Sequence, residues 1–315
     1  MTQPLPHDDA KHDGSKRHSL ECMLWAGTGL LWTVVGGVPR SALIGSAQAQ
    51  TPGGGFSFAQ VSDSHLGFST PLYSDVAATT AEAIAQLKSG PAPSLVLHTG
   101  DVTHLSRPAE FDAAQQIFGT SGLEIHYVPG EHDVIDDDGK GFYERFGRGA
   151  GPAGWYSFDA GGVHFIGLNN VMNLRAGGLG QLGAEQLRFL EQDLRDRSAS
   201  LPIVLFAHIP LWTVHAPWGW GTQDAEQALG LLARFGSVTI LNGHIHQIIQ
   251  KVEGQIAFHT ARSTAFPQPA PGSTPSPGPV RDLPAGRLHS VLGVTRISRV
   301  EGRAPLAIID TPLGA

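Results

Sequence analysis

The sequence predicts a single α/β domain with two sheets in its core and helices outside them. Between residues 56 and 246, short apolar runs of β type alternate with segments of helical spacing. After residue 246 the alternation stops, and strand candidates follow one another. Several β-type runs end in side chains that bind metal ions, and the strand ends of an α/β sheet gather such residues at one edge. The sequence therefore places a functional site at that edge.

Helical spacing of apolar residues predicts five helices. The first has the pattern of a surface helix, and the second begins with a proline, which suits the first turn of a helix. The third is shorter, and the fourth has the clearest pattern. The predicted helices cover residues 73–88, 108–118, 140–146, 184–197 and 224–235.

Strands are predicted where short apolar runs end at turn signals. Residues 155–158 and 163–168 flank an Asp-Ala-Gly-Gly turn and form a predicted hairpin. Residues 267–284 are rich in Pro, Gly and Ser, and we expect a long surface loop there. The other predicted strands cover residues 56–61, 95–99, 123–128, 203–207, 238–241, 248–252, 256–260, 288–297 and 306–310.

Composition limits the classes of function. The 315 residues are 41% hydrophobic and 16% charged, which is enough apolar material for a globular core. The formal net charge of −7 argues against a general binder of nucleic-acid polymers or anionic membranes. The single cysteine, Cys22, precedes the predicted domain, so any transition metal there must be held by carboxylates and histidines.

Residues 1–49 are predicted to be an export signal. Lys16 and Arg17 precede a glycine-interrupted apolar run, and Ala47-Gln48-Ala49 matches a small-residue cleavage site. The basic pair resembles a twin-arginine signal with Lys in place of the first Arg. We therefore expect contact with export machinery, a periplasmic or secreted mature domain at residues 50–315, and no stable membrane association after cleavage. A single membrane anchor is the alternative, although the run is short and interrupted for a span of ~20 residues.

Metal-competent side chains follow five of the predicted strands. They combine carboxylates with imidazoles, a donor set that suits Zn, Mn or Fe better than Mg or Ca, which prefer oxygen alone. Each residue by itself could instead be a helix cap, a turn residue or a core histidine. As a set they are too many for one catalytic ion with open positions and about enough for two ions that share a bridge. In chain order they are Asp63, His65, Asp101, Glu131, His208, His244 and His246.

The order of these motifs resembles that of the calcineurin-like metallophosphoesterases, and more closely their cyclic-nucleotide phosphodiesterase branch than the protein phosphatases. The resemblance covers residues 63–246 and implies a four-layer α-β-β-α sandwich of two mixed sheets with a dinuclear metal centre. The motifs are Asp63-x-His65, Gly100-Asp101, Gly130-Glu131-His132-Asp133, His208 and Gly243-His244-x-His246. The implied ligand sets are Asp63, His65 and His246 for one ion, Glu131, His208 and His244 for the other, and Asp101 as the bridge.

One residue departs from the family pattern. The family has Asn between the Gly and the His of the third of these motifs, where this sequence has Glu131. A carboxylate can ligate through oxygen as an amide does, but it adds a negative charge and a longer reach. The charge would favour a harder or more highly charged ion, weaken the attraction for an anionic substrate, or leave the second site poorly filled.

The implied reaction is the hydrolysis of a small phosphodiester, of the cyclic-nucleotide or glycerophosphodiester type, by water activated at two ions roughly 3.5–4 Å apart. His132 is predicted to stabilise or protonate the leaving oxygen, with Asp133 orienting its ring. His104, His215 and Arg262 are predicted substrate contacts. A phosphomonoesterase and a non-catalytic module that binds metal or phosphate are the alternative functions.

The remaining histidines and the tryptophans receive structural predictions. His98, His126 and His164 lie inside apolar runs, so we expect them to be buried or at an edge of a sheet. The tryptophans of the loop before residue 224 are expected to anchor that loop, with base stacking as the alternative. They are Trp212, Trp218 and Trp220.

Overall fold

The computed structural model describes residues 30–35, 38–43, 55–147, 150, 154–299 and 306–314 of the chain. The chain divides into the units Met1–Thr51 and Pro52–Ala315. In the first unit, β1 (Leu30–Val35) pairs antiparallel with β2 (Val38–Leu43). The rest of the predicted export segment lies outside the described residues, so export stays a prediction. No helix among the described residues is long and apolar enough to cross a membrane.

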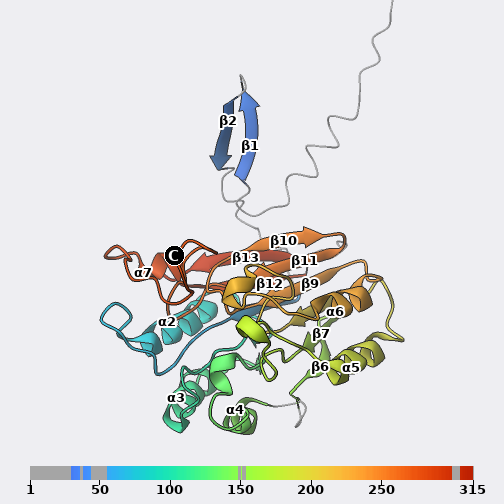
Figure 1. Cartoon of the computed structure of the whole chain (residues 1–315), viewed down its shortest axis with the longest axis horizontal. Coiled ribbons are helices and arrows are strands. Elements are labelled where there is room, and N and C mark those ends of the chain that lie inside the picture. Colours follow the sequence, from blue (N-terminus) through green and yellow to red (C-terminus); the bar gives the residue numbers. More distant parts are fainter. Residues whose placement is uncertain are drawn as a thin grey trace, which may run out of the picture. The chain divides into compact units, whose positions relative to one another are not determined.

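Two mixed sheets form the centre of the second unit (Figure 1). The five-stranded sheet has the order β13 (Ala307–Pro312), β12 (Gly293–Ser298), β3 (Ser57–Val61), β4 (Val96–His98) and β5 (Ile125–Tyr127). In it β3, β4 and β5 run parallel, and β12 is antiparallel to both of its neighbours.

The second sheet has six strands, of which β7, β8, β9 and β11 run parallel while the two edge strands run antiparallel to their neighbours. Its order is β10 (Gln250–Glu253), β11 (Ile256–Thr260), β9 (Val238–Asn242), β8 (Ile203–Phe206), β7 (Val163–Gly167) and β6 (Tyr156–Ala160).

Helices cover the outer face of each sheet. Apolar side chains of α2 (Val76–Lys88), α3 (Pro108–Gly119) and α4 (Lys140–Phe146) pack on the five-stranded sheet. Those of α5 (Ala184–Leu194) and α6 (Ala225–Leu232) pack on the six-stranded sheet. The short elements are α7 (Leu288–Val291) and the 3₁₀ helices η1 (Glu131–Asp133), η3 (Ala176–Gly178) and η4 (Ala216–Trp218).

Alternation of side chains along the strands separates three apolar layers, because successive residues of a strand point to opposite faces. Phe58 and Phe165 pack between the two sheets, with ring centroids 5.0 Å apart. Their chain neighbours Ala59 and Ile166 face the helices instead. The order is therefore helix, sheet, sheet, helix, and the predicted four-layer sandwich is confirmed.

Local signals explain where two helices begin. Helix α2 starts three residues later than predicted because the Asp75 carboxylate caps it, accepting a hydrogen bond of 2.8 Å from the main-chain N–H of Ala78. Helix α3 starts at Pro108, as predicted, because a proline in the first turn gives up no helical hydrogen bond.

The strand predicted for residues 288–297 is wrong in its first part. Residues 288–291 form α7, and β12 starts at Gly293. Leu288 and Leu292 lie one helical turn apart and both pack against the core. The apolar run therefore contains a helical turn followed by a strand. Residues 267–284 contain no helix or strand. In that segment the Val280 carbonyl accepts a hydrogen bond of 2.6 Å from the Tyr73 hydroxyl.

Candidate metal centre

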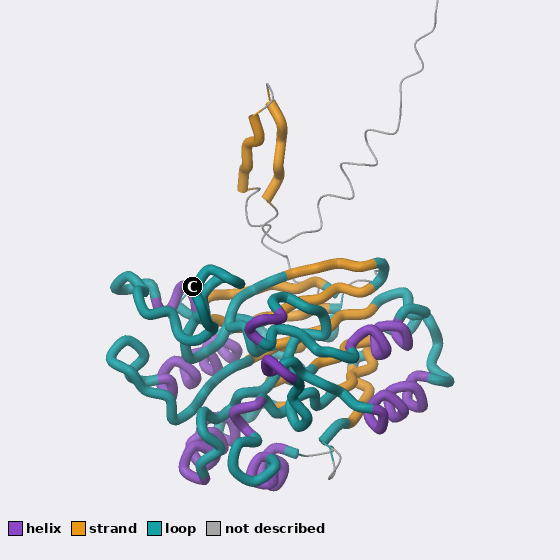
Figure 2. The backbone as a smooth tube through the Cα atoms, in the orientation of Figure 1, coloured by secondary structure: helices purple, strands orange, loops and turns teal. Residues whose placement is uncertain are grey.

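The predicted ligands follow the carboxyl ends of β3, β4, β5, β8 and β9, with Glu131 as the first residue of η1 and the others in loops. Figure 2 shows the loops that join the strands and helices in teal. The two sheets are tied together at these ends. The main-chain N–H of His244, after β9, donates a hydrogen bond of 2.9 Å to the carboxylate of Asp63, after β3. His208 Nδ1, after β8, lies 2.7 Å from the carbonyl oxygen of Thr99, after β4. Residues far apart in the sequence are therefore held at one place.

The first ligand group consists of Asp63, His65, Asp101 and His246, whose donor atoms lie close together. His65 Nε2 is 3.1 Å from His246 Nε2 and 3.4 Å from Asp101 Oδ2. His246 Nε2 is 3.3 Å from Asp63 Oδ1. All four side chains are almost completely buried. Water therefore does not reach these ligand atoms. A cation bound among them would supply the interactions that water cannot.

The second ligand group consists of Glu131, His208 and His244. The two Glu131 oxygens are divided between the imidazoles, with Oε2 3.0 Å from His208 Nε2 and Oε1 2.9 Å from His244 Nδ1. His208 Nε2 also lies 3.3 Å from Asp101 Oδ2 of the first group. Asp101 Oδ2 thus borders both groups, which is the position of a bridging ligand.

Several buried atoms of these groups have no hydrogen-bond partner, although their neighbours are close. An unsatisfied buried donor or acceptor costs roughly 1–3 kcal/mol. These oxygen and nitrogen atoms converge without forming hydrogen bonds. A cation bound among them would interact with all of them. The atoms are Asp63 Oδ2, Glu131 Oε2, His208 Nε2 and both ring nitrogens of His244.

The backbone of the ligand loops is left-handed at five ligands. Only a few per cent of residues other than glycine adopt a positive φ, and such strain is common at functional sites. The ligands Asp63, His65, Asp101, His244 and His246 have φ of 53°, 40°, 52°, 69° and 53°. This conformation turns each chain sharply at the strand end and brings the side chains inward.

Close approach of the loops requires glycine at two positions. A Cβ on Gly243 would lie 2.7 Å from Asp63 Oδ2, and one on Gly130 would overlap the Asp101 carboxylate. Both glycines therefore leave space that the ligands occupy.

Charge within the site holds the carboxylates of Asp63 and Glu131 ionised. Burial raises the pKa of Asp63, but His246 and His208 outweigh burial and lower the pKa to about 2. Burial likewise raises the pKa of Glu131, and His244 and His208 bring it well below the ordinary value. For His65, burial and the neighbouring histidines lower the pKa. Burial also lowers the pKa of His208, but the Asp101 and Glu131 carboxylates outweigh burial and raise it well above its ordinary value, so an ion that binds this ring would displace a proton.

Hydrogen bonds to main-chain carbonyls fix the orientation of two ligand imidazoles. His208 Nδ1 donates to the Thr99 carbonyl, and His246 Nδ1 donates to the Phe266 carbonyl, both at 2.7 Å. Because Nδ1 is used in this hydrogen bond, each ring turns Nε2 toward the ligand group, where it would ligate an ion. These acceptors could not be predicted from residue types, because a main-chain carbonyl is present at every residue.

Asp133 does not orient the His132 ring, so that expectation is wrong. The Asp133 carboxylate is fully buried and accepts hydrogen bonds from the main-chain N–H groups of Gly130, Val102 and Thr103. Because its acceptor capacity is used by the loop backbone, it joins the Asp101 loop to the Glu131 loop. His132 Nδ1 instead lies 2.6 Å from the carbonyl oxygen of His104.

The three predicted substrate contacts have different surroundings. His104 lies in the centre, with Nδ1 3.3 Å from His65 Nδ1. His215 precedes η4 and packs edge-on against Trp218, with ring centroids 4.9 Å apart. Arg262 has a buried, unpartnered Nη1. No described contact joins His215 or Arg262 to either ligand group, so their substrate roles stay predictions.

The tryptophan loop supports the ligands from behind. Trp218 and Trp220 are buried and pack together with Ile245, which lies between the ligands His244 and His246. Trp212 packs edge-on against Phe258 in the outer core. These contacts are packing contacts, and they leave the faces of Trp218 and Trp220 inaccessible for base stacking.

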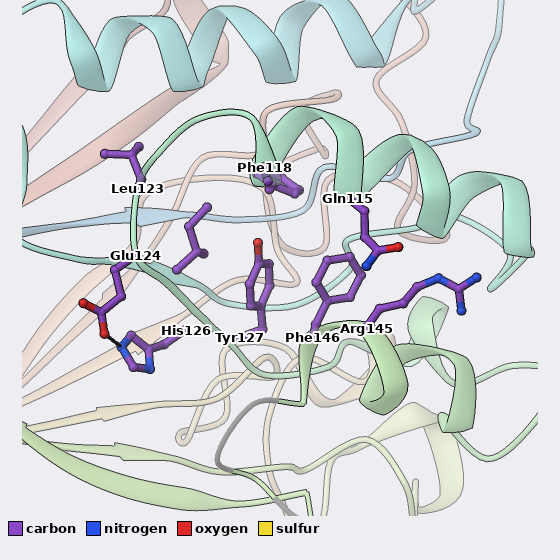
Figure 3. Close-up of a pocket in the computed structure, with 10 residues that line it drawn as sticks. Gln115, Phe118, Leu123, Glu124, His126, Tyr127, Arg145 and Phe146 are labelled. Carbon is purple, nitrogen blue, oxygen red and sulfur yellow. Dashed lines mark hydrogen bonds and ion pairs between the residues drawn. The ribbon is translucent and has the colours of Figure 1, made fainter.

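A separate cavity of about 260 Å³ lies among α3, β5 and α4 (Figure 3). The Glu124–His126 pair, 3.0 Å apart, stands at one side of it and Arg145 at another. Because none of the predicted ligands lines this cavity, it is distinct from the metal centre.

Comparison with known proteins places this geometry in context. The family model described as calcineurin-like phosphoesterase matches residues 56–248. A 3′,5′-cyclic-nucleotide phosphodiesterase of Nostoc is 24% identical over 79% of this chain and 94% of its own length. The glycerophosphodiester phosphodiesterase GpdQ of Enterobacter lignolyticus is 26% identical over 67% and 78%. A probable cyclic nucleotide phosphodiesterase of Psychrobacter is 25% identical over 62% of this chain, and the match spans 59% of that relative.

Solved structures support the same fold. A dimetal phosphatase from Danio rerio superposes with a TM-score of 0.59 at 14% identity, covering 81% of this chain and 98% of its own. A purple acid phosphatase from yellow lupin superposes with a TM-score of 0.57 at 15% identity, covering 78% and 49%. At these identities the likeness concerns the fold alone.

Proposed function

The chain belongs to the calcineurin-like phosphoesterase family of hydrolases, and on that premise we propose that it is an exported phosphodiesterase with two metal ions. Its substrates are small phosphodiesters of the cyclic-nucleotide or glycerophosphodiester type. The substrate class is supported by relatives named as cyclic-nucleotide and glycerophosphodiester phosphodiesterases. The mixed nitrogen and oxygen donors favour Fe, Mn or Zn as the ions.

The observation that carries the proposal is the convergence of buried, unpartnered ligand atoms in two adjoining groups. Asp63, His65 and His246 would hold one ion. Asp101 would bridge, because its Oδ2 borders both groups. The second ion would be held by Glu131, His208 and His244. Two such ions, when bound, polarise the phosphoryl oxygens and activate the attacking water.

His132 is the proposed proton donor to the leaving oxygen. Its Nδ1 donates to the His104 carbonyl, so Nε2 is the ring nitrogen left for a substrate. Burial lowers the pKa of His132, but Asp101 and Glu131 outweigh burial and raise it, which keeps a proton on the ring nearer to neutral pH. A binding module has no need of such a donor.

Turnover of aryl phosphates tests the proposed function. The purified protein, supplied with Mn, Zn or Fe, is assayed with a bis-aryl phosphate and a mono-aryl phosphate. The proposal predicts faster hydrolysis of the diester. Faster hydrolysis of the monoester would assign the protein to the phosphomonoesterases, and turnover of neither would favour a binding module.

The leaving group tests the role of His132. His132→Ala should reduce turnover by roughly 10²–10⁴-fold for a diester with a poor alkoxide leaving group, the usual contribution of a general acid. An activated aryloxide needs no proton, so its hydrolysis should fall much less. Equal losses for both substrates would refute the acid role.

Glu131 is proposed to ligate the second ion through its carboxylate. An amide oxygen at the same position could replace it, so Glu131→Asn should preserve or raise diester turnover. The measurement is turnover together with metal content of the variant. A folded variant that had lost its second ion would count against this role.

Export is supported by the basic pair at Lys16 and Arg17 and by the small residues at positions 47–49. Expression of the full chain in a bacterium with a twin-arginine pathway should yield a periplasmic product whose N-terminus is residue 50. A full-length product retained in the cytoplasm or the membrane would contradict the proposal.

A further inference from the structure

We propose that His104 is a positioning residue that holds the metal ligand His65 and the proton donor His132, and that it is not a substrate contact. This inference rests on the proposed metal centre. His104 is partly buried and follows β4 in the same loop as Asp101. Its main chain and its ring both contact the Asp63 loop and the Glu131 loop.

The ring of His104 provides the partner of His65 on the side away from the ligand group. His65 Nε2 faces His246 and Asp101, while His65 Nδ1 lies 3.3 Å from His104 Nδ1. A hydrogen bond between two ring nitrogens needs one proton in total. When Nε2 of His65 binds an ion, the His65 proton must be on Nδ1 and is donated to His104 Nδ1.

His65 differs from two other ligand imidazoles in the nature of this partner. The distal nitrogens of His208 and His246 donate to main-chain carbonyls, which no substitution can remove. The acceptor of His65 is a side chain. The orientation of this one ligand therefore depends on a residue that can be changed without touching the ion.

The main chain of His104 ties the three ligand loops together. Its N–H donates to the Leu66 carbonyl in the Asp63 loop at 3.0 Å. Its carbonyl accepts from His132 Nδ1 at 2.6 Å. Its ring stacks on the His132 ring, with centroids 4.9 Å apart and planes 16° apart, and Phe68 packs edge-on against it at 4.9 Å. The ring is thus fixed on several sides, as a positioning residue must be.

Two amide substitutions distinguish the roles of the two ring nitrogens of His104. The side-chain oxygen of Asn can take the place of Nδ1, because both are bonded to Cγ, whereas that of Gln reaches toward the place of Nε2. If His104 acts through Nδ1, His104→Asn keeps the acceptor for His65 and His104→Gln does not. If His104 contacts the substrate through Nε2, the result is the reverse.

The experiment is a calorimetric titration of the metal-free full chain and its variants with Mn²⁺ alone. We expect His104→Ala and His104→Gln to weaken the binding of one ion by about 10–100-fold, the usual effect of losing the partner of a metal-bound histidine. His104→Asn should stay within a few-fold of wild type. The control is His289→Ala, because His289 is exposed and pairs with Glu82 on α2.

Kinetics give the second readout. At saturating Mn²⁺ the KM of His104→Ala for a diester should match that of wild type, because His104 does not contact the substrate. Unchanged Mn²⁺ affinity in all variants, with a KM that saturating Mn²⁺ does not restore, would overturn the inference in favour of a substrate contact. Failure of His104→Asn to recover affinity while remaining folded would also overturn it. Wild type that binds no ion would overturn the metal centre, and this inference with it.

Discussion

The His164 group and the two ligand groups both combine histidines with carboxylates, and they differ in how their polar atoms are satisfied. In the first, His164 on β7 is completely buried, with Nδ1 2.7 Å from Asp159 and Nε2 2.6 Å from Asp193. Arg197 pairs with Asp159 at 3.0 Å. In the two ligand groups, the buried atoms Asp63 Oδ2, His208 Nε2 and both nitrogens of His244 lie near other ligand atoms but have no hydrogen-bond partner.

The backbone differs in the same way. His164 lies within a regular strand, where it pairs with Ile203 and Asp159 across the sheet. The ligand loops instead place Asp63 and Asp101 at φ of 53° and 52°. Both features cost free energy in the ligand groups and cost little around His164. Unsatisfied atoms on a strained backbone, and not the residue types themselves, therefore distinguish the metal centre from a structural pair.

The largest predicted effect is a loss of diester turnover on substitution in the ligand groups, which substitution in the His164 group should not cause. Asp101→Ala removes the carboxylate that borders both ligand groups. Metal-dependent diester turnover should therefore fall by more than the roughly 10–100-fold that follows loss of a hydrogen-bond partner of a metal ligand. Turnover measured with excess Mn²⁺ checks this expectation. Wild-type turnover in the variant would break the distinction.

Packing behind the ligands should link stability to metal binding. Ile245 is completely buried against Trp218 and Trp220 between two ligands, so Ile245→Ala should lower the free energy of unfolding by about 2–5 kcal/mol and weaken Mn²⁺ binding. Urea unfolding and Mn²⁺ titration measure the two effects. Leu190→Ala in the outer core is the control, with a similar loss of stability and unchanged affinity. Equal Mn²⁺ affinities in the two variants would contradict the link.

The His164 group should affect stability alone. His164→Ala leaves the largely buried Asp193 carboxylate without one of its hydrogen-bond donors, so we expect a loss of about 1.5–3 kcal/mol in the free energy of unfolding. Turnover per folded molecule should equal that of wild type. A loss of turnover in the folded variant would show that this group affects the metal centre and would contradict the prediction.

The smallest predicted effect depends on pH. Burial raises the pKa of Asp193, but hydrogen bonds from His164 and Ser157 outweigh burial and lower the pKa. A lowered folded pKa stabilises the protein above the unfolded value of about 3.9 and ceases to do so as the pH falls through the folded pKa. The difference in unfolding free energy between wild type and Asp193→Asn should therefore shrink from about pH 7 to about pH 3. A difference that stayed constant or grew would contradict this account.

Much of the fold could be predicted from the sequence because its signals are local. Apolar spacing located the helices to within a few residues, and the strand-end residues from Asp63 to His246 marked the edge where the ligands meet. The failure at residues 288–297 arose because a single apolar run served a helix turn and then a strand.

The supporting contacts of the site could not be predicted in the same way. The partners of His208 and Asp133 are main-chain groups, which carry no sequence signal. His104 was singled out only because it closely follows Asp101, whereas in the structure its ring contacts the ligand His65. Residue types indicate which chemistry is available, whereas hydrogen-bond geometry decides which residue performs it.

The central claim is that the two ligand groups hold two ions. The most direct test is elemental analysis of the folded, as-purified mature protein, paired with diester turnover of the same sample. We predict about two transition-metal ions per chain together with diester hydrolysis. One ion or none, with no turnover after addition of Mn, Zn or Fe, would contradict the account.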